Sequence, residues 1–146
     1  MKTSLRLLLC GLLPAPMGFC MSLLLQNYVA SGQTWAALGF FGPLFWFFAG
    51  WKLHSGRRPL WQRTFLVHVP ALTAWCLAMY QILLRESWFP SALGAVSQHF
   101  FLPFLTPAFA LTAAVPSQSL WPAFTAAFLL MLLSFYLGGL AKQKIH

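Results

Sequence analysis

The feature that most constrains this chain is a series of apolar blocks, each long enough to form a membrane-spanning helix. Such a helix needs about 20 predominantly apolar residues, and blocks of this order follow one another with short polar breaks between them. Only 7% of the residues are charged, whereas a water-soluble domain carries roughly a quarter. We therefore predict an all-α, polytopic integral membrane protein, a single bundle of about five helices over residues 1–146. The blocks lie at about 7–25, 35–51, 64–84, 91–115 and 120–140.

Basic residues gather in short segments between the apolar blocks, and nine Lys and Arg stand against a single Glu. The densest segment is the loop 52–63. Because cytoplasmic loops carry an excess of Lys and Arg, we expect this loop and the N-terminus to be cytoplasmic, in a plasma membrane or bacterial inner membrane. This pattern indicates contact with anionic lipid and no nucleic-acid partner. The expected headgroup contacts are Lys52, Arg57, Arg58, Trp61 and Arg63.

The number of crossings depends on the fourth block. Five crossings place six cations inside and three outside, because Lys142 and Lys144 then lie outside. Four crossings leave residues 89–118 as a re-entrant or interfacial segment and change the distribution to eight inside and one outside. The charge rule favours four. The apolar run 100–115 favours five, because irregular backbone within lipid must be shielded by other protein. We expect five crossings and keep four as the alternative.

Prolines and small residues predict local features of the helices. Pro14 and Pro16 remove backbone donors, so a kink is expected near the middle of the first helix. Small residues let helices approach closely, and such residues recur in the second, fourth and fifth blocks. The expected packing positions are Ala110 with Ala114 in the fourth block and Ala123 with Ala127 in the fifth, for contact between the last two helices or with a partner. Gly39 and Gly42 are the small residues of the second block.

Few residues are available for chemistry. One Glu cannot supply the paired carboxylates of acid–base catalysis or of a Mg²⁺ or Ca²⁺ site, and no nucleophile motif is present. The possible functional polar positions are His68, His99, Arg85 and Glu86. Ionisable groups within membrane spans tend to be functional. Haem held by two histidines needs both at similar depth, and we expect His68 and His99 at opposite depths. We predict no catalytic, metal or cofactor site.

The sequence therefore favours a small non-enzymatic membrane protein that is an accessory, assembly or structural subunit of a membrane complex or homo-oligomer. Its partners would be the lipid bilayer and other membrane subunits or further copies of itself. Two alternatives stay open. One is a small oligomeric transporter or channel for an anionic or lipophilic solute, in which proline-broken helices line the path. The other is a haem- or lipid-handling membrane protein that uses His68 or His99.

Overall fold

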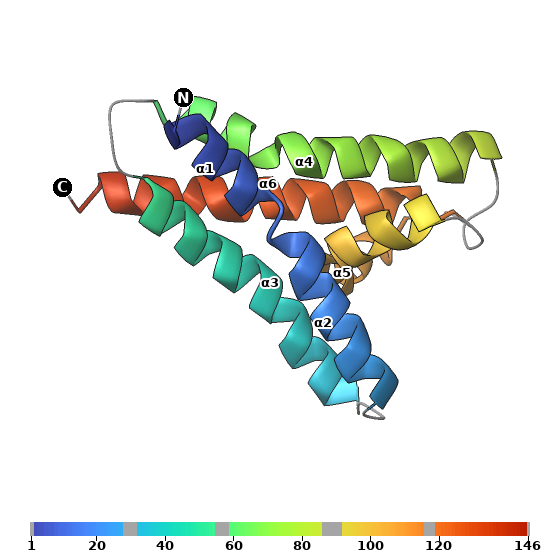
Figure 1. Cartoon of the computed structure of the whole chain (residues 1–146). Helices are drawn as coiled ribbons and strands as arrows, with labels where there is room; N and C mark the ends of the chain where they lie inside the picture. The colour runs from blue at the N-terminus through green and yellow to red at the C-terminus, as the bar shows by residue number, and fades with distance from the viewer. Residues whose placement is uncertain (1, 28–31, 55–58, 86–91, 116–118, 146) are drawn as a thin grey trace.

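The computed structural model describes residues 2–27, 32–54, 59–85, 92–115 and 119–145, and this part of the chain is helical and contains no strand (Figure 1). The predicted all-α class is confirmed. Each apolar block of the sequence corresponds to helix, although the first is divided in two. The elements are α1 (Lys2–Gly11), α2 (Pro14–Asn27), α3 (Gly32–Leu53), α4 (Leu60–Tyr80), the π-helical η1 (Gln81–Arg85), α5 (Ala92–Thr112) and α6 (Trp121–Gln143).

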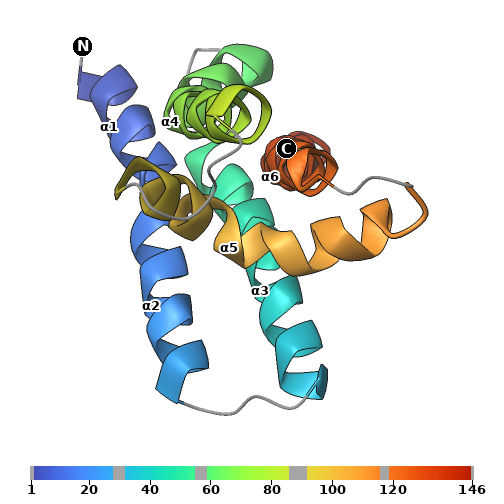
Figure 2. The ribbon, with the colours of Figure 1, turned by 90° about the vertical axis from the view of Figure 1, so that its right-hand side faces the viewer.

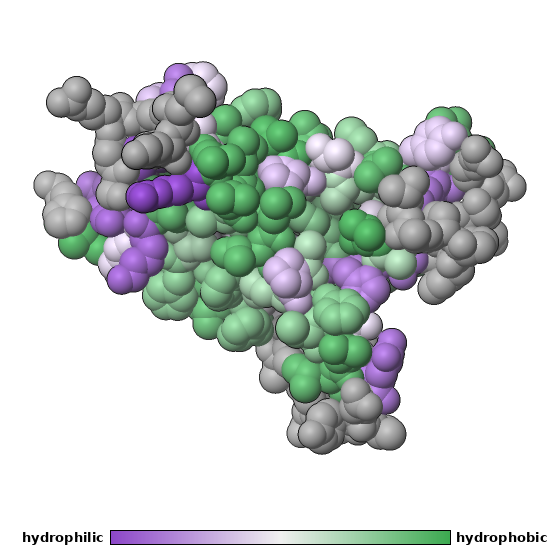
Figure 3. All heavy atoms as spheres, viewed as in Figure 1, coloured by the Kyte–Doolittle hydropathy of each residue, from purple (hydrophilic) through white to green (hydrophobic). Residues whose placement is uncertain are grey.

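Three stretches of the described residues are long and apolar enough to cross a membrane: Ser4–Gln26, Leu60–Leu84 and Trp121–Gln143. Only 28%, 33% and 39% of their most apolar windows, respectively, are buried inside the molecule. Their apolar side chains therefore face largely outward, which matches a lipid environment. Figure 3 shows apolar residues over the middle of one face and hydrophilic ones towards its ends, including the end where both chain termini lie.

The interruption between α1 and α2 follows from two prolines. Pro14 and Pro16 have no backbone N–H, and the amides of Leu12 and Leu13 donate to carbonyls only three residues back, at 3.1 Å each. This tighter pattern ends α1 at Gly11, and α2 begins at Pro14, where the fixed φ of proline suits a first helical turn. The predicted kink is confirmed as a complete break.

The helix α5 runs across the others. The helices α4 and α6 lie side by side and antiparallel (Figure 1). Figure 2 views α4 and α6 along their axes, whereas α5 is seen from the side, so α5 crosses the direction of these two helices. It contacts α2, α3, α4 and α6. This position makes α5 the element on which most of the bundle packs.

The end of α6 returns to the end of the molecule where α1 begins (Figure 1). Gly138 of α6 packs near the backbone of Trp51, close to the end of α3, and Gly139 packs against Leu60 at the start of α4. Five crossings would instead place the two chain ends on opposite sides. The alternative of four crossings requires both ends on one side, and the segment that contains α5 lies across the bundle; the number of crossings stays a prediction.

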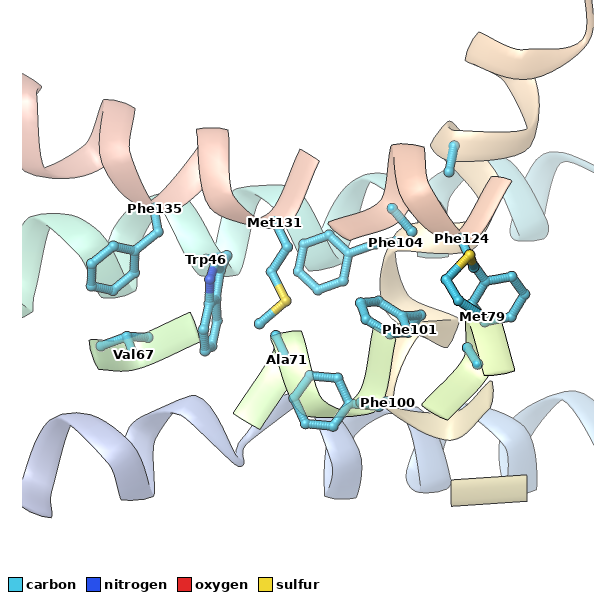
Figure 4. Packing of buried hydrophobic residues seen from close by; sticks show 14 of the residues in the cluster. Trp46, Val67, Ala71, Met79, Phe100, Phe101, Phe104, Phe124, Met131 and Phe135 are labelled. Atoms are coloured by element: carbon cyan, nitrogen blue, oxygen red, sulfur yellow. The ribbon is translucent and has the colours of Figure 1, made fainter. Parts of the chain in front are cut away.

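Aromatic side chains fill the interior between α3, α4, α5 and α6 (Figure 4). Trp46, Phe101, Phe124 and Phe135 are each at most 1% exposed. The rings of Trp46 and Phe135 lie 5.9 Å apart, and those of Phe101 and Phe124 lie 5.8 Å apart edge to face. Tilted and edge-to-face pairs at these distances are favourable beyond the burial of their area. Part of the aromatic content therefore stabilises the core and does not face lipid.

Glycines allow α3 and α6 to meet backbone to backbone. A Cβ on Gly138 would lie 1.9 Å from the carbonyl oxygen of Phe47, and a Cβ on Gly50 would lie 2.1 Å from that of Phe135. The contact is reciprocal, since each helix offers a glycine to a carbonyl of the other. Separations under 3.0 Å essentially never occur for real Cβ atoms, so neither position accepts a larger residue without movement of a backbone.

The predicted alanine pairs have different outcomes. Ala123 and Ala127 are buried, at 3% and 0% exposed, as expected for packing positions. Ala110 and Ala114 are exposed, so the expected contact between the last two helices does not use them. The reason is the rotation of α5: Ala108, two residues before Ala110 and thus on the opposite face, is the buried residue.

Replacing Gly138 by alanine tests the α3–α6 contact. The added methyl group meets the Phe47 carbonyl, and overpacking of this kind costs about 1–3 kcal/mol. We expect Gly138→Ala to lower the thermal unfolding midpoint in detergent, followed by tryptophan fluorescence. The control is Leu137→Ala, because Leu137 is 45% exposed. Equal midpoints for the two variants would contradict the close approach.

Candidate functional site

His68 is a buried histidine that joins α3 to α4. Its side chain is 3% exposed. The indole Nε1 of Trp46 donates to His68 Nε2 at 3.1 Å, and His68 Nδ1 lies 2.6 Å from the carbonyl oxygen of Thr64. An indole N–H can only donate and a carbonyl can only accept. The proton of the imidazole is therefore on Nδ1, and the ring is neutral.

The surroundings of His68 are aromatic. Its ring lies edge-on to Trp46 at 6.0 Å and to Phe135 at 5.5 Å, measured between ring centroids. Because both ring nitrogens already make hydrogen bonds within the protein, neither is available to haem iron or to another metal in this conformation. His68 thus contributes to helix packing, and the haem alternative loses one of its two candidate residues.

Arg63 was expected to contact lipid headgroups, and this prediction is wrong. Its side chain is only 2% exposed, and Nη1 donates to the carbonyl oxygen of Leu53 at 2.8 Å. Leu53 is the last residue of α3, where carbonyls lack partners within the helix. A cation at this position also interacts favourably with the helix dipole. Arg63 therefore caps α3 from the first turn of α4, a role that depends on the two helices meeting.

His54 lies beside Arg63 and follows the end of α3 directly. Its Nδ1 atom is buried and makes no hydrogen bond. Burial, and then the positive charges of Arg63 and Lys142, lower the pKa of His54 below its usual value of 6.5. Basic groups from the ends of α3 and α6 and the start of α4 therefore form a positively charged cluster. We call His54, Arg63 and Lys142 the basic cluster.

The remaining predicted positions are distributed over the molecule. Lys52 and Trp61 are exposed, in agreement with contact to headgroups. The Nδ1 atom of His99 lies 2.5 Å from the Ala95 carbonyl, and its ring lies 5.8 Å from that of Phe19. The ring contacts of His68 and His99 are thus with different residues. For Arg85 only the backbone is described, at the end of η1, and Arg57, Arg58 and Glu86 lie outside the described residues.

Metal ligands do not cluster in the described ranges. No group of three or more His, Cys, Asp or Glu side chains within them is placed to hold an ion. The cysteines Cys10, Cys20 and Cys76 are free thiols. The described residues therefore offer hydrogen bonds between helices and apolar surfaces, but no assembled metal centre.

Two prolines in α5 free the carbonyls that meet neighbouring glycines. Pro103 and Pro107 lack the N–H that would bond the carbonyls of His99 and Pro103, four residues back. A Cβ on Gly18 of α2 would lie 1.6 Å from the His99 oxygen, and one on Gly42 of α3 would lie 2.2 Å from the Pro103 oxygen. The hydrogen that replaces the Cβ therefore points at the carbonyl, the arrangement of a weak Cα–H···O hydrogen bond.

An apolar groove of about 530 Å³ lies between α2 and α3. The two helices contact α5 at His99 and Pro103, one helical turn apart, and Figure 2 shows them as separate columns below α5. None of the lining residues is charged or carries a hydroxyl group, so the groove suits an apolar guest. We call it the α2–α3 groove. Its lining residues are Leu13, Pro16, Met17, Cys20, Met21, Leu24, Phe41, Phe45 and Pro103.

The groove was not predicted from the sequence, although its residues on α2 follow a regular spacing. Leu13, Met17, Cys20 and Leu24 recur at the spacing of one helical face. In a chain where every face of every helix is apolar, such a stripe is not distinguished from its surroundings. The separation of α2 from α3 depends on their contacts with α5, which are tertiary.

No protein-family model, curated protein or solved structure matches this chain. We therefore infer its function from its own residues and their geometry.

The hydrogen bond between Trp46 and His68 gives a direct test of the buried contact. Trp46→Phe keeps most of the ring but leaves His68 Nε2 as a buried acceptor without a donor, at a cost of about 1–3 kcal/mol. We expect a lower thermal midpoint in detergent. Trp61→Phe is the matched control, because Trp61 is 64% exposed, and it should unfold like the wild type. A midpoint unchanged in Trp46→Phe would contradict the assignment.

His54 predicts a pH dependence of stability. Its pKa is lowered in the folded protein, so folding disfavours the protonated form. The contribution of neutral His54 to the free energy of unfolding is fully present above pH 6.5. It is lost as the pH falls from 6.5 through the folded-state pKa. We expect the thermal midpoint of His54→Gln to change less with pH between pH 7 and pH 5 than the midpoint of the wild type, so its slope against pH is smaller. Lys142→Gln should reduce the slope, whereas Lys144→Gln should not. A wild-type slope in His54→Gln would contradict this.

Proposed function

We propose that the protein is a small non-enzymatic integral membrane protein of a plasma or bacterial inner membrane. It acts as an accessory, assembly or structural subunit of a membrane complex, or as a homo-oligomer, through contacts made within the bilayer. The observation that carries the proposal is that polar side chains are buried between helices while large apolar side chains are exposed on the outside. The buried polar groups His68 and Arg63 are used in contacts between helices, while large apolar side chains cover much of the outside.

The same proposal includes a topology. The proposed crossings are the three apolar stretches given above, formed by α1 with α2, by α4 with η1, and by α6. The helix α3 is proposed as a fourth crossing, because its 22 residues connect α2 to α4, and the segment with α5 lies across the bundle. The end that carries Lys52 and the basic cluster faces the cytoplasm, together with the N-terminus. This orientation follows the excess of Lys and Arg expected in cytoplasmic loops, and it places eight of the nine cations on that side.

The exposed apolar surface supports an acyl-chain or protein environment. Phe40 is 70% exposed, Phe65 is 61% and Leu84 is 74%. These residues belong to α3, α4 and η1, so the apolar surface surrounds the bundle and is not one local patch. A soluble monomer rarely exposes contiguous apolar area on this scale. The side chains face lipid or a neighbouring subunit.

The lipid-handling alternative is favoured by one specific observation, the α2–α3 groove. It differs from the form expected from the sequence, because His68 is used in helix packing and lies outside the lining. A transporter for an anionic solute has less support, since the groove contains no cation.

Fractionation and cross-linking test the proposal. We expect the protein to stay in the membrane pellet after carbonate washing, and a fluorescent reporter fused after His146 to report a cytoplasmic C-terminus. Cross-linking in intact membranes should give a discrete larger species, either a multimer of this chain or a complex with a second membrane protein. Recovery in the carbonate supernatant would overturn the membrane assignment. Monomer alone, in membranes and in mild detergent, would overturn the subunit role.

A further inference from the structure

We propose that the α2–α3 groove binds one acyl chain of an anionic phospholipid whose headgroup lies at Lys52. The inference rests on the proposed membrane location and deepens it by naming the guest. It would give the protein a specific lipid partner in addition to the surrounding bilayer. The size of the groove, its position along α3 and an exposed cation further along the same face of α3 support it.

The volume of the groove fits one acyl chain. At about 30 Å³ for each methylene group, close to the share of one water molecule in the liquid, a groove of 530 Å³ holds roughly 17 carbons. A helix of about 10–12 Å diameter occupies ~420–610 Å³ for every turn of 5.4 Å. The groove therefore takes up only about one turn of a partner helix, whereas a spanning helix has five or six. An acyl chain therefore fits within this space, whereas a partner helix would enter it with only part of its side chains.

A stripe on α3 connects the groove to a positive charge. Phe41, Phe45, Phe48 and Lys52 recur at i, i+4, i+7 and i+11 and share one face of the helix. Phe41 and Phe45 line the groove, Phe48 is 51% exposed, and Lys52 is exposed. The face that receives the chain thus ends in a cation able to contact a phosphate.

The length of this stripe equals the depth of one leaflet. Eleven residues separate Phe41 from Lys52, and at 1.5 Å for each residue this is about 16 Å. Half of a hydrocarbon core of ~30 Å is about 15 Å. A lipid with its phosphate at Lys52 would therefore pass Phe48 with the first part of its acyl chain and enter the groove, between Phe45 and Phe41, with the remainder. Both the charge of Lys52 and its distance from Phe41 therefore favour a lipid of the leaflet whose headgroups lie at the end of the molecule that carries Lys52.

The lining is both preformed and adaptable. Gly18 and Gly42 hold α2 and α3 against the backbone of α5, so the groove does not have to open before a chain enters. The rings of Phe41 and Phe45 stack at 6.1 Å with an interplanar angle of 26°. Opposite them, Met17, Cys20 and Met21 offer polarisable side chains, and the flexible methionines can adjust to an irregular chain. A chain in the groove has protein on three sides, whereas bulk lipid contacts a single face.

Native mass spectrometry of the full chain tests the proposal. The protein is purified in mild detergent, delipidated, and titrated with phosphatidylglycerol or phosphatidylcholine of identical acyl chains. We expect one bound lipid, with phosphatidylglycerol preferred. Cys20→Trp places an indole in the groove and should weaken both lipids roughly tenfold or more, the effect of displacing about two methylenes. Lys52→Gln should reduce the preference for phosphatidylglycerol about fivefold and leave phosphatidylcholine binding unchanged.

Matched variants separate the site from the general surface. Leu133→Trp puts an indole on an exposed position of α6 that does not line the groove, and Lys144→Gln removes a cation from the same end of the molecule. Both should bind like the wild type. Should Cys20→Trp fail to fold, Leu24→Phe fills the groove from its other end. Equal binding by Cys20→Trp and Leu133→Trp, or equal loss of preference in Lys52→Gln and Lys144→Gln, would overturn the proposal.

Two further outcomes are informative. If Cys20→Trp loses a co-purifying protein but binds lipid like the wild type, the groove is assigned to a partner helix and the proposed lipid binding is overturned. Absence of any bound lipid from a protein that stays in carbonate-washed membranes would overturn this inference and leave the proposed function standing. Release from washed membranes would overturn the proposed function instead.

Discussion

The fold depends above all on contacts between glycines and backbone carbonyls of neighbouring helices. Gly50 and Gly138 join α3 to α6, Gly18 joins α2 to α5, and Gly42 joins α3 to α5. Between helices in lipid the hydrophobic effect contributes little, because the acyl chains are as apolar as the side chains. Close van der Waals packing and weak hydrogen bonds have to replace it. Glycine allows both, since the missing Cβ brings two backbones into contact.

The prolines of α5 explain why two of these contacts lie where they do. A carbonyl that loses its helical donor is costly in a medium without water, where backbone groups must be satisfied within the protein. Pro103 and Pro107 create two such carbonyls on successive turns, at His99 and Pro103, and Gly18 and Gly42 approach them. The same spacing fixes the distance between α2 and α3. The α2–α3 groove is therefore a consequence of how proline and glycine positions match on three helices.

Much of the fold could be predicted from the sequence, because length and apolarity identify membrane helices without tertiary information. The blocks became helices, and the break at Pro14 appears where backbone chemistry requires it. Two paths stayed open for the fourth block, a crossing or a re-entrant or interfacial segment, since a run of apolar residues has no direction within a bilayer. The rotation of α5 was equally invisible, so Ala110 was expected inside and Ala108 is the buried residue.

The candidate site was less predictable than the fold. Arg63 was expected at the headgroups because its charge suggests a surface position, but its burial depends on α3 ending beside the first turn of α4. His68 was singled out as an ionisable group within a span, but its partner Trp46, 22 residues earlier, is known only from the packing of α3 on α4. The glycines that join the helices had no regular spacing to distinguish them, apart from Gly39 and Gly42.

The near absence of carboxylates determines how this protein uses its polar groups. With a single Glu in the chain, buried cations and imidazoles cannot be balanced by acids, so they have to bond neutral groups. Arg63 meets a carbonyl at the end of α3, where the helix dipole is negative, and His68 stays neutral between an indole and a carbonyl. Among the described cations, Lys52 and Lys144 are exposed and can face anionic headgroups. Under the proposed function, recognition therefore rests on apolar shape in the membrane interior and on positive charge at one rim, and the proposed phospholipid matches this combination with one tail and one phosphate.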